Sequence, residues 1–365
     1  MAQDRLSHPS SRYRVVIPRA NNLDLLRFIF AAMVFFVHAY HLSNAKPLSF
    51  LGNVLSSSFA VDAFFVVSGF LIFMSYEYST DIKSYFVKRI RRIYPAYFAV
   101  ILACTLLGAL ISDLPLSSYF TAPALYRYLA SNLAFMNFLQ PDLPGVFSEN
   151  QLSAVNGALW TLKIEVMFYI SVPLLVWYFR KIGLWQGLLT VYVLSFIYHY
   201  VVGILIAQHG GGLYIEAQRQ LPGQLMYFIA GGAIYYYFDK FSMYWKWVCL
   251  LAIGLYFIEQ IYSLYIVHAI IVAIGVIYFG CIFKYLGNFA KYGDLSYGVY
   301  ILHFPILQTL IAFGLFSSAP FLALGLPTVL VLASAFLMWH LVERPMLKNS
   351  SHYVAAGHSG YISEK

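Results

Sequence analysis

Long apolar runs recur along the whole chain, and short polar segments separate them. The runs cover about residues 22–41, 58–77, 94–112, 157–179, 184–207, 223–238, 245–261, 264–284, 295–316 and 321–342. An α-helix needs roughly 20 residues to cross the ~30 Å hydrocarbon core of a bilayer, and most of the runs approach that length. Backbone groups in lipid must be hydrogen-bonded internally, so apolar runs of this kind form helices. The pattern predicts an all-α integral membrane protein with about ten transmembrane helices.

Basic residues gather in alternate loops between these runs. They are Lys83, Lys88, Arg89, Arg91 and Arg92 after the second run, Arg180 and Lys181 after the fourth, then Lys240, Lys284, Lys291, Arg344 and Lys348. The opposite loops hold few basic residues beyond Arg127 and Arg219. Cytoplasmic loops carry the excess of Lys and Arg, so this alternation predicts an even number of spans with both termini in the cytoplasm.

The apolar runs and the basic loops together predict the domain organisation. Residues 1–20 form a cytoplasmic tail, residues 21–347 a single transmembrane domain, and residues 348–365 a second cytoplasmic tail. The short apolar segment 126–139 fits an interfacial helix on the outer face. The polar, basic start lacks a cleavable signal pattern, so the first apolar helix is expected to stay as an anchor.

Composition excludes several other classes of protein. Hydrophobic residues make up 61% of the chain and charged residues 10%, whereas soluble domains carry roughly 25% charged residues. The net charge of +8 comes from loop clusters and not from a basic face, so no nucleic-acid partner is predicted. The three cysteines stand alone within apolar runs, which predicts neither a disulfide framework nor a metal site. The sequence gives no prediction of oligomeric state.

The first span contains an arginine and a histidine on the same face of the helix. Arg27 and His38 are eleven residues apart, three turns plus about 20°, so they share one helix face about 16 Å apart along the axis. Ionisable residues inside spans are costly and therefore candidates for function. An arginine reaching to the inner interface and a histidine at the outer one would give the same pattern.

Two carboxylates enter the membrane from the outer half of later spans. Asp62 lies near the start of the second span, and Glu165 lies about 12 Å below the outer edge of the fourth. Together with His38 they predict a polar site shared by three spans. In the competing interpretation Asp62 is an interfacial residue and Glu165 pairs with Lys163.

Two further sets of residues stand out. Arg89 and Arg92 are three residues apart and form one cationic helix face, which suits phosphate binding but also follows from membrane orientation alone. His303 precedes Pro305 in the ninth span, where a core histidine and a functional one are equally acceptable.

The order of these segments resembles the membrane acyltransferase-3 family over about residues 20–347. The matching segments are LDLLRF with the following VH (Arg27, His38), VDAFFVVSGFLI, the Arg-x-x-Arg pair at Arg89 and Arg92 before IYPAY, ALWTLKIEVMFY, SYGVYILHFPI and VERP at Glu343. Each motif is weak alone, but six in the right order are specific.

The resemblance implies an activity. Family members O-acylate cell-surface polysaccharides, lipopolysaccharide, Nod factors and some macrolides, with acyl-CoA, most often acetyl-CoA, as the cytoplasmic donor. The expectation is therefore a multi-pass O-acetyltransferase of the bacterial inner membrane that acts on a glycan or polysaccharide hydroxyl outside. Some relatives carry a fused extracytoplasmic domain for which this chain has no room, so its membrane domain is expected to recognise the acceptor.

A mechanism follows from the resemblance and the candidate residues. Arg89 and Arg92 hold the donor phosphates, and Arg27 reaches the same donor. His38 acts as general base on the acceptor hydroxyl, oriented by Glu165 or Asp62, or it carries the acyl group as a covalent intermediate. The expected substrate contacts are Trp160, Tyr169 and His303.

Two other classes of protein are alternatives. A secondary transporter or flippase for a polar or lipid-linked solute would also need intramembrane charges, but its usual paired halves are not evident. A non-catalytic sensor or scaffold would leave the Arg27–His38 spacing and the arginine pair without a purpose. Dependence on acyl-CoA separates the enzyme from both.

Overall fold

The computed structural model describes residues 15–318 and 320–347, and these residues form helices and loops without a β-strand. The predicted tail 348–365, and residues 1–14 of the other predicted tail, lie outside the described residues. The prediction of an all-α membrane protein is confirmed.

Eight stretches of the described residues are helical, long and apolar enough to cross a bilayer. They are Leu23–Ser43 (α1), Lys46–Glu77 (ending in α3, Ser57–Glu77), Ile82–Ile111 (α4), Gly157–Ile182 (η3 and α7, Trp160–Ile182), Leu184–His209 (α8), Phe238–Tyr262 (α11), Tyr265–Ile282 (η4, α12 and η5) and Pro320–Met346 (α15, η7 and α16). Helices also occupy the two other predicted spans, as α10 (Leu221–Tyr236) and α13 (Ser296–Ala312). With 16 and 17 residues these two reach about 25 Å, somewhat less than the hydrocarbon thickness. Ten crossings and cytoplasmic termini stay predictions.

The short helices between these stretches are α5 (Leu116–Thr121), α6 (Pro123–Leu133), η2 (Asn137–Leu139), α9 (Gly212–Gln218), η6 (Phe289–Tyr292) and α14 (Leu315–Ser318). The stretches themselves contain η1 (Lys46–Leu48), α2 (Ser49–Val54), η3 (Gly157–Leu159), η4 (Tyr265–Val267), α12 (His268–Ile277), the π-helix η5 (Tyr278–Ile282), the longer α15 (Pro320–Met338), the π-helix η7 (Trp339–Glu343) and α16 (Arg344–Met346). The predicted interfacial segment 126–139 forms most of α6 and all of η2. The arginine-rich stretch 88–92 is the first part of α4 and continues directly into the third predicted span. Pro95 lies inside this continuous helix.

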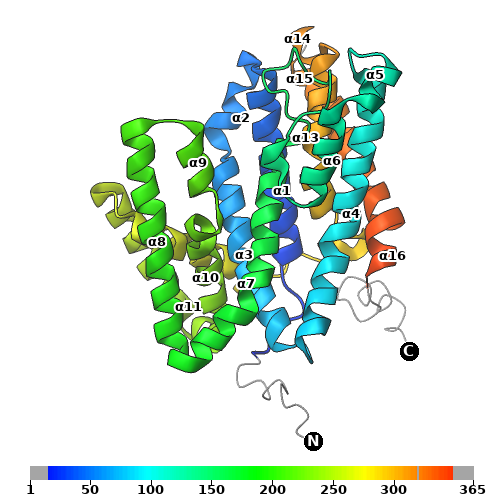
Figure 1. Ribbon diagram of the computed structural model, residues 1–365. Helices are drawn as coiled ribbons and strands as arrows, with labels where there is room; N and C mark the ends of the chain where they lie inside the picture. The colour runs from blue at the N-terminus through cyan, green and yellow to red at the C-terminus, as the bar shows by residue number, and fades with distance from the viewer. Residues whose placement is uncertain (1–14, 319, 348–365) are drawn as a thin grey trace, which may run out of the picture. The chain divides into compact units, whose positions relative to one another are not determined.

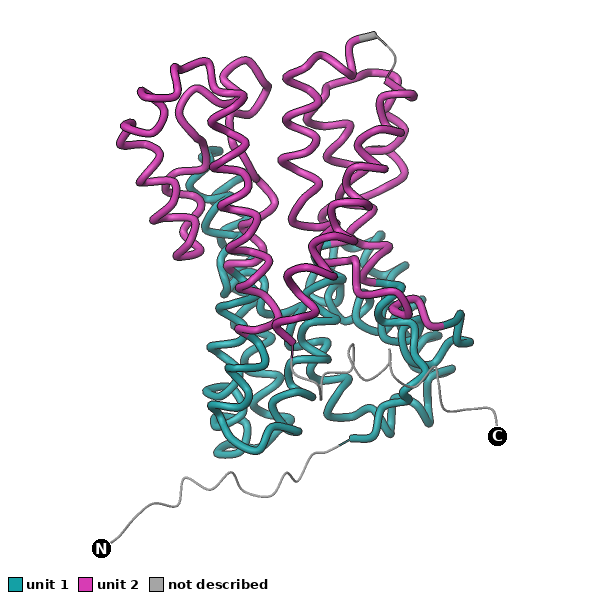
Figure 2. Tube along the Cα trace, turned by 90° about the vertical axis from the view of Figure 1, so that its right-hand side faces the viewer, with its two compact units in different colours: residues 1–26, 61–89, 164–287 teal, residues 27–60, 90–163, 288–365 magenta. Residues whose placement is uncertain are grey.

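Contacts divide the chain into two compact units, coloured separately in Figure 2. Unit 1 holds residues 1–26, 61–89 and 164–287, and unit 2 holds residues 27–60, 90–163 and 288–365. Four of the five boundaries fall within α1, α3, α4 and α7, so each of these helices contributes to both units.

In unit 1, α8, α10, α11 and α12 pack side by side, and Figure 1 shows the first three together. The unit-1 part of α3 meets α10 through glycines. A Cβ on Gly69 would lie 1.9 Å from the carbonyl oxygen of Phe228, and one on Gly231 would lie 2.0 Å from that of Val66. Such close backbone contact between helices depends on small residues, as is common in membranes.

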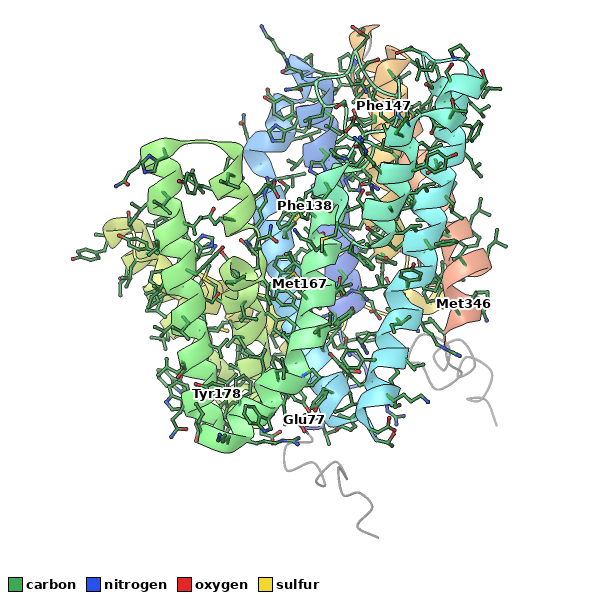
Figure 3. The ribbon with its side chains drawn as sticks, in the orientation of Figure 1. Glu77, Phe138, Phe147, Met167, Tyr178 and Met346 are labelled. Carbon is green, nitrogen blue, oxygen red and sulfur yellow. The ribbon has the colours of Figure 1, made fainter. Side chains whose placement is uncertain are left out.

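The last residue of α3, in unit 1, is a buried carboxylate. Glu77 is inaccessible to solvent and accepts hydrogen bonds of 2.9 Å from Arg180 of α7 and from the Tyr236 hydroxyl of α10. Figure 3 labels Glu77 near Tyr178, at the same end of the unit. A buried carboxylate is stable only with such partners, so this contact ties three helices together.

In unit 2, α13 packs along α15 (Figure 1). Gly298 allows the close approach, because a Cβ there would lie 2.9 Å from the Cα of Ala335. The Tyr297 hydroxyl donates to the carbonyl oxygen of Ile93 at 3.0 Å, which joins α13 to α4. These contacts fix α13, the helix that carries His303.

Candidate active site

Two histidines of unit 2 contact each other inside the protein. Nδ1 of His38 on α1 lies 2.8 Å from Nε2 of His303 on α13, and the rings stack with centroids 5.1 Å apart. His303 is fully buried and His38 partly so. The sequence pointed to both residues separately, and the structure brings them together.

The hydrogen bonds of the pair determine where its protons sit. Nδ1 of His303 lies 3.2 Å from the carbonyl oxygen of Val299, which can only accept, so this nitrogen carries the hydrogen. In a neutral ring Nε2 of His303 is then the acceptor, and Nδ1 of His38 must donate to it. The lone pair of a neutral His38 is therefore on Nε2, where a general base needs it.

Aromatic and hydroxyl side chains surround the pair. The rings of Tyr300 and His303 lie 5.9 Å apart, and the Tyr300 hydroxyl shares a 2.8 Å hydrogen bond with Thr161 at the start of α7. Phe304 packs edge-on against His38 at 5.5 Å between ring centroids. Gly157 makes room for Phe304, because a Cβ there would lie 2.7 Å from that ring.

The loop before α7 is fastened to α13 by amide side chains. Nδ2 of Asn156 donates to the carbonyl oxygen of Ile301 at 2.8 Å. Nε2 of Gln308 donates to the carbonyl oxygens of Leu152 and Ala154 at 2.6 and 2.8 Å. Both amides are buried, so these hydrogen bonds satisfy their donors and hold the loop against α13.

A network of buried ion pairs lies in the same unit. Nη1 of Arg27 contacts Oδ2 of Asp294 at 2.7 Å, Arg92 contacts that same oxygen, and Nη1 of Arg92 contacts Oε2 of Glu343 at 2.8 Å. The Asp294 and Glu343 side chains are 2% exposed. Burial alone would raise the pKa of Asp294, but the two guanidinium groups hold it well below its usual range.

Local backbone geometry places both carboxylates. Gly293 has a φ of +122°, and a Cβ there would lie 2.3 Å from the Trp339 ring, so the turn before Asp294 requires glycine. Glu343 ends the π-helix η7, an irregularity that often marks functional sites. Arg92 lies 5.7 and 5.8 Å from the ring centroids of Tyr297 and Trp339.

Three predicted site residues meet in unit 1. Oε1 of Glu165 accepts a 2.6 Å hydrogen bond from the Tyr169 hydroxyl, and the guanidinium of Arg89 lies 5.7 Å from the Tyr169 ring centroid. Arg89 also donates to Oγ of Ser75 at 2.7 Å. The backbone carbonyl of Tyr169 accepts from Tyr85, which holds this turn of α7 in place.

The remaining predicted residues have partners of their own. Asp62 on α3 is hydrogen-bonded to Tyr227 on α10, within unit 1. Trp160 is half-buried at the start of α7. Nζ of Lys163 lies 4.5 Å above the Phe138 ring. The roles given to these residues from sequence stay predictions.

The sequence patterns assign no role to Asp294 or Glu343, although both pair with arginines in the ion-pair network. Glu343 was visible only as part of the VERP motif. The available signal for Asp294 was its place two residues before Ser296 of the SYGVY segment, where a carboxylate can accept from the first backbone amides of a helix. Neither signal names a partner some 200 or more residues away.

The fold and the site define a polytopic membrane protein with a histidine pair suited to acid–base chemistry. The profile of the acyltransferase-3 family, described as an acyltransferase domain, matches residues 20–340, and the chain belongs to this family. The resemblance found in the sequence motifs is therefore confirmed, and the protein is a multi-pass membrane acyltransferase.

Two relatives align over almost the whole chain. Nodulation protein 10 of Rhizobium leguminosarum bv. viciae is 28% identical over 371 residues, covering 92% of this chain and 95% of that protein. The O-acetyl transferase of Shigella phage Sf6 is 29% identical over 351 residues, covering 91% and 98%. No solved structure matches.

Proposed function

We propose that the protein is a bacterial inner-membrane O-acetyltransferase that moves an acetyl group from cytoplasmic acetyl-CoA to a glycan hydroxyl outside. The acceptor in this proposal is a cell-surface polysaccharide or a lipid-linked glycan. The observation that carries it is the 2.8 Å contact between His38 and His303, which leaves Nε2 of His38 as the base. Membership of the acyltransferase-3 family and the O-acetyl transferase relative support the reaction class.

The chemistry needs one base and one acid, and His38 serves as both. Nε2 of His38 takes the proton of the acceptor hydroxyl as the oxygen attacks the thioester carbonyl. The tetrahedral species collapses, the carbon–sulfur bond breaks, and the leaving CoA sulfur takes the proton back from His38. His303 accepts the hydrogen bond from Nδ1 of His38 throughout and holds the ring in one tautomer.

A covalent route uses the same nitrogen differently. Nε2 of His38 attacks the thioester carbonyl first, the carbon–sulfur bond breaks, and CoA leaves as the thiolate. The acceptor oxygen then takes the acetyl group from His38, and the hydroxyl proton passes to the CoA thiolate. Radiolabelled acetyl-CoA without acceptor separates the two routes: acid-labile label on the wild-type protein and none on His38→Ala supports the covalent route.

For the donor, the proposal rests on Arg89. Its Nη2 donates to Ser75, while its buried Nε has no hydrogen-bond partner among the described residues. A guanidinium with an unused donor suits a phosphate oxygen of CoA. Phosphate binding by Arg92 and Arg27 stays a prediction. Both guanidinium groups are paired with carboxylates here.

The test is the O-acetyl content of surface polysaccharide, measured by proton NMR in cells with the gene intact, deleted, or carrying His38→Ala. His41→Ala is the matched control, because His41 is an exposed histidine near the end of the same helix. The proposal expects loss of the acetyl signal in the deletion and in His38→Ala, and its retention in His41→Ala. A signal that persists in the deletion rules out the polysaccharide acceptor, and binding of acetyl-CoA to the purified protein then decides the donor.

A further inference from the structure

The α1 helix and the segment that forms α13 contact each other at two levels. Arg27 meets Asp294 at one level, and His38 meets His303 at the other. Eleven residues of α1 rise about 16 Å, and nine helical residues rise about 14 Å. The long Arg27 side chain spans this small difference. The two segments therefore run in the same direction with both ends of the contact fixed.

Asp294 is held rigidly at its end. Its Oδ1 accepts from the backbone amide of Ser296 at 3.1 Å and from the Ser296 hydroxyl, at the first residue of α13. Its Oδ2 accepts from Arg27 and Arg92. One oxygen thus anchors α13 and the other anchors α1 and α4, so the carboxylate is a junction of three helices.

The side chains of the network are largely buried. Two arginines face two carboxylates, and the rings of Tyr297 and Trp339 lie near Arg92. A donor phosphate would have to displace a buried carboxylate to reach Arg92. Separating such a pair leaves an uncompensated charge, which is strongly unfavourable. A structural clamp fits this geometry better than an anion site.

We propose that Asp294 is a positioning residue: by pairing with Arg27 and Arg92 it sets the register of α1 against α13 and so aligns His38 with His303. This inference rests on the proposed acetyl transfer only for its kinetic readout. A slip of one residue moves a helix by about 1.5 Å, enough to break the histidine contact. The eleven-residue spacing of Arg27 and His38 then has a physical reason: the arginine fixes the height of α1 at which His38 meets His303.

The kinetic test uses Asp294→Asn, Arg27→Gln and Arg27→Lys in membranes that contain the native acceptor, with acetyl-CoA as the varied substrate. Glu216→Gln is the control, because it breaks the exposed ion pair of Glu216 with Arg219. Misplacement by an ångström costs about 100-fold in rate, so we expect that loss in kcat for Asp294→Asn and Arg27→Gln. The KM for acetyl-CoA should stay within about threefold, and Arg27→Lys should recover part of kcat.

The alternative, in which these arginines bind donor phosphate, gives opposite results. Arg27→Gln would then raise the KM for acetyl-CoA with little change in kcat. Asp294→Asn would lower that KM by removing the competing carboxylate. Either outcome overturns the proposal, and Arg27→Gln decides alone if Asp294→Asn fails to fold.

A second readout needs no activity. Spin labels are placed at His41→Cys and Ala312→Cys, exposed sites on α1 and α13, after replacement of the native cysteines. The distance distribution by pulsed electron resonance should be narrow in the parent and in Glu216→Gln, and broadened or shifted in Asp294→Asn and Arg27→Gln. An unchanged distribution in both variants overturns the proposal. If the parent neither binds nor turns over acetyl-CoA, the proposed function fails, and the distances still decide the register.

Discussion

His303 donates through Nδ1 to the carbonyl oxygen of Val299, one turn earlier in α13, and this contact determines which nitrogen faces His38. A backbone carbonyl cannot donate, so the proton assignment passes from α13 to the His303 ring and from there to His38. The reactive nitrogen of one helix is thus chosen by the backbone of another.

This relationship predicts a graded series at His303. His303→Ala removes the acceptor for Nδ1 of His38 and should lower kcat by about 100-fold or more. His303→Gln keeps an acceptor oxygen and should retain more activity. Turnover of acetyl-CoA in membranes measures both, and equal activity of the alanine variant and the parent would refute the role of His303.

Arg89 should affect donor binding and not the chemical step. Arg89→Gln removes the guanidinium near Ser75 and Tyr169, and we expect the KM and Kd for acetyl-CoA to rise about tenfold with kcat kept. Lys83→Gln is the control, because Lys83 is an exposed cation on the first turn of the same helix. An equal effect of both substitutions would indicate general electrostatic attraction and no specific phosphate contact.

The helix contact at Gly69 should tolerate no side chain. Gly69→Ala places a Cβ 1.9 Å from the Phe228 carbonyl oxygen, so α3 and α10 must separate, and stability should fall by about 1–3 kcal/mol or more. Gly254→Ala is the matched control, since nothing lies within 4 Å of its Cβ. A helix-interior alanine there should be neutral or stabilising by about 0.5–1 kcal/mol. Thermal unfolding in detergent compares the two.

Asp294 should contribute a pH-independent stability near neutrality. Its pKa is lower in the folded protein than in the unfolded chain, so its ion pairs stabilise the fold above the unfolded value of about 4. That contribution is lost as the pH falls toward the folded value. The difference in melting temperature between the parent and Asp294→Asn should therefore be constant from about pH 5 to pH 8 and shrink below about pH 4. Glu343→Gln is then introduced into both the parent and the Asp294→Asn variant, and the comparison is repeated. This removes any contribution of Glu343 to the pH dependence.

Local pattern predicted the helices well. The first apolar run, expected at 22–41, is α1 at Leu23–Ser43, and the run expected at 184–207 is α8 at Leu184–His209. Apolar length and polar breaks determine such helices, because lipid leaves the backbone no other partner. The third apolar run was expected to begin at residue 94, whereas α4 begins at Ile82 and includes the arginine-rich stretch. Apolar length marks only the part of a helix that lies in lipid, so it does not show where the helix continues into the polar interface.

By itself, the sequence determined the class of protein, the helices, the family motifs and the shared face of Arg27 and His38, because these depend on composition and on a period of 3.6 residues. Only the tertiary structure decided that His38 pairs with His303 and that Arg27 pairs with Asp294. These partners are more than 260 residues away in the chain. Periodicity says which side chains share a face, but helix packing alone decides what that face meets.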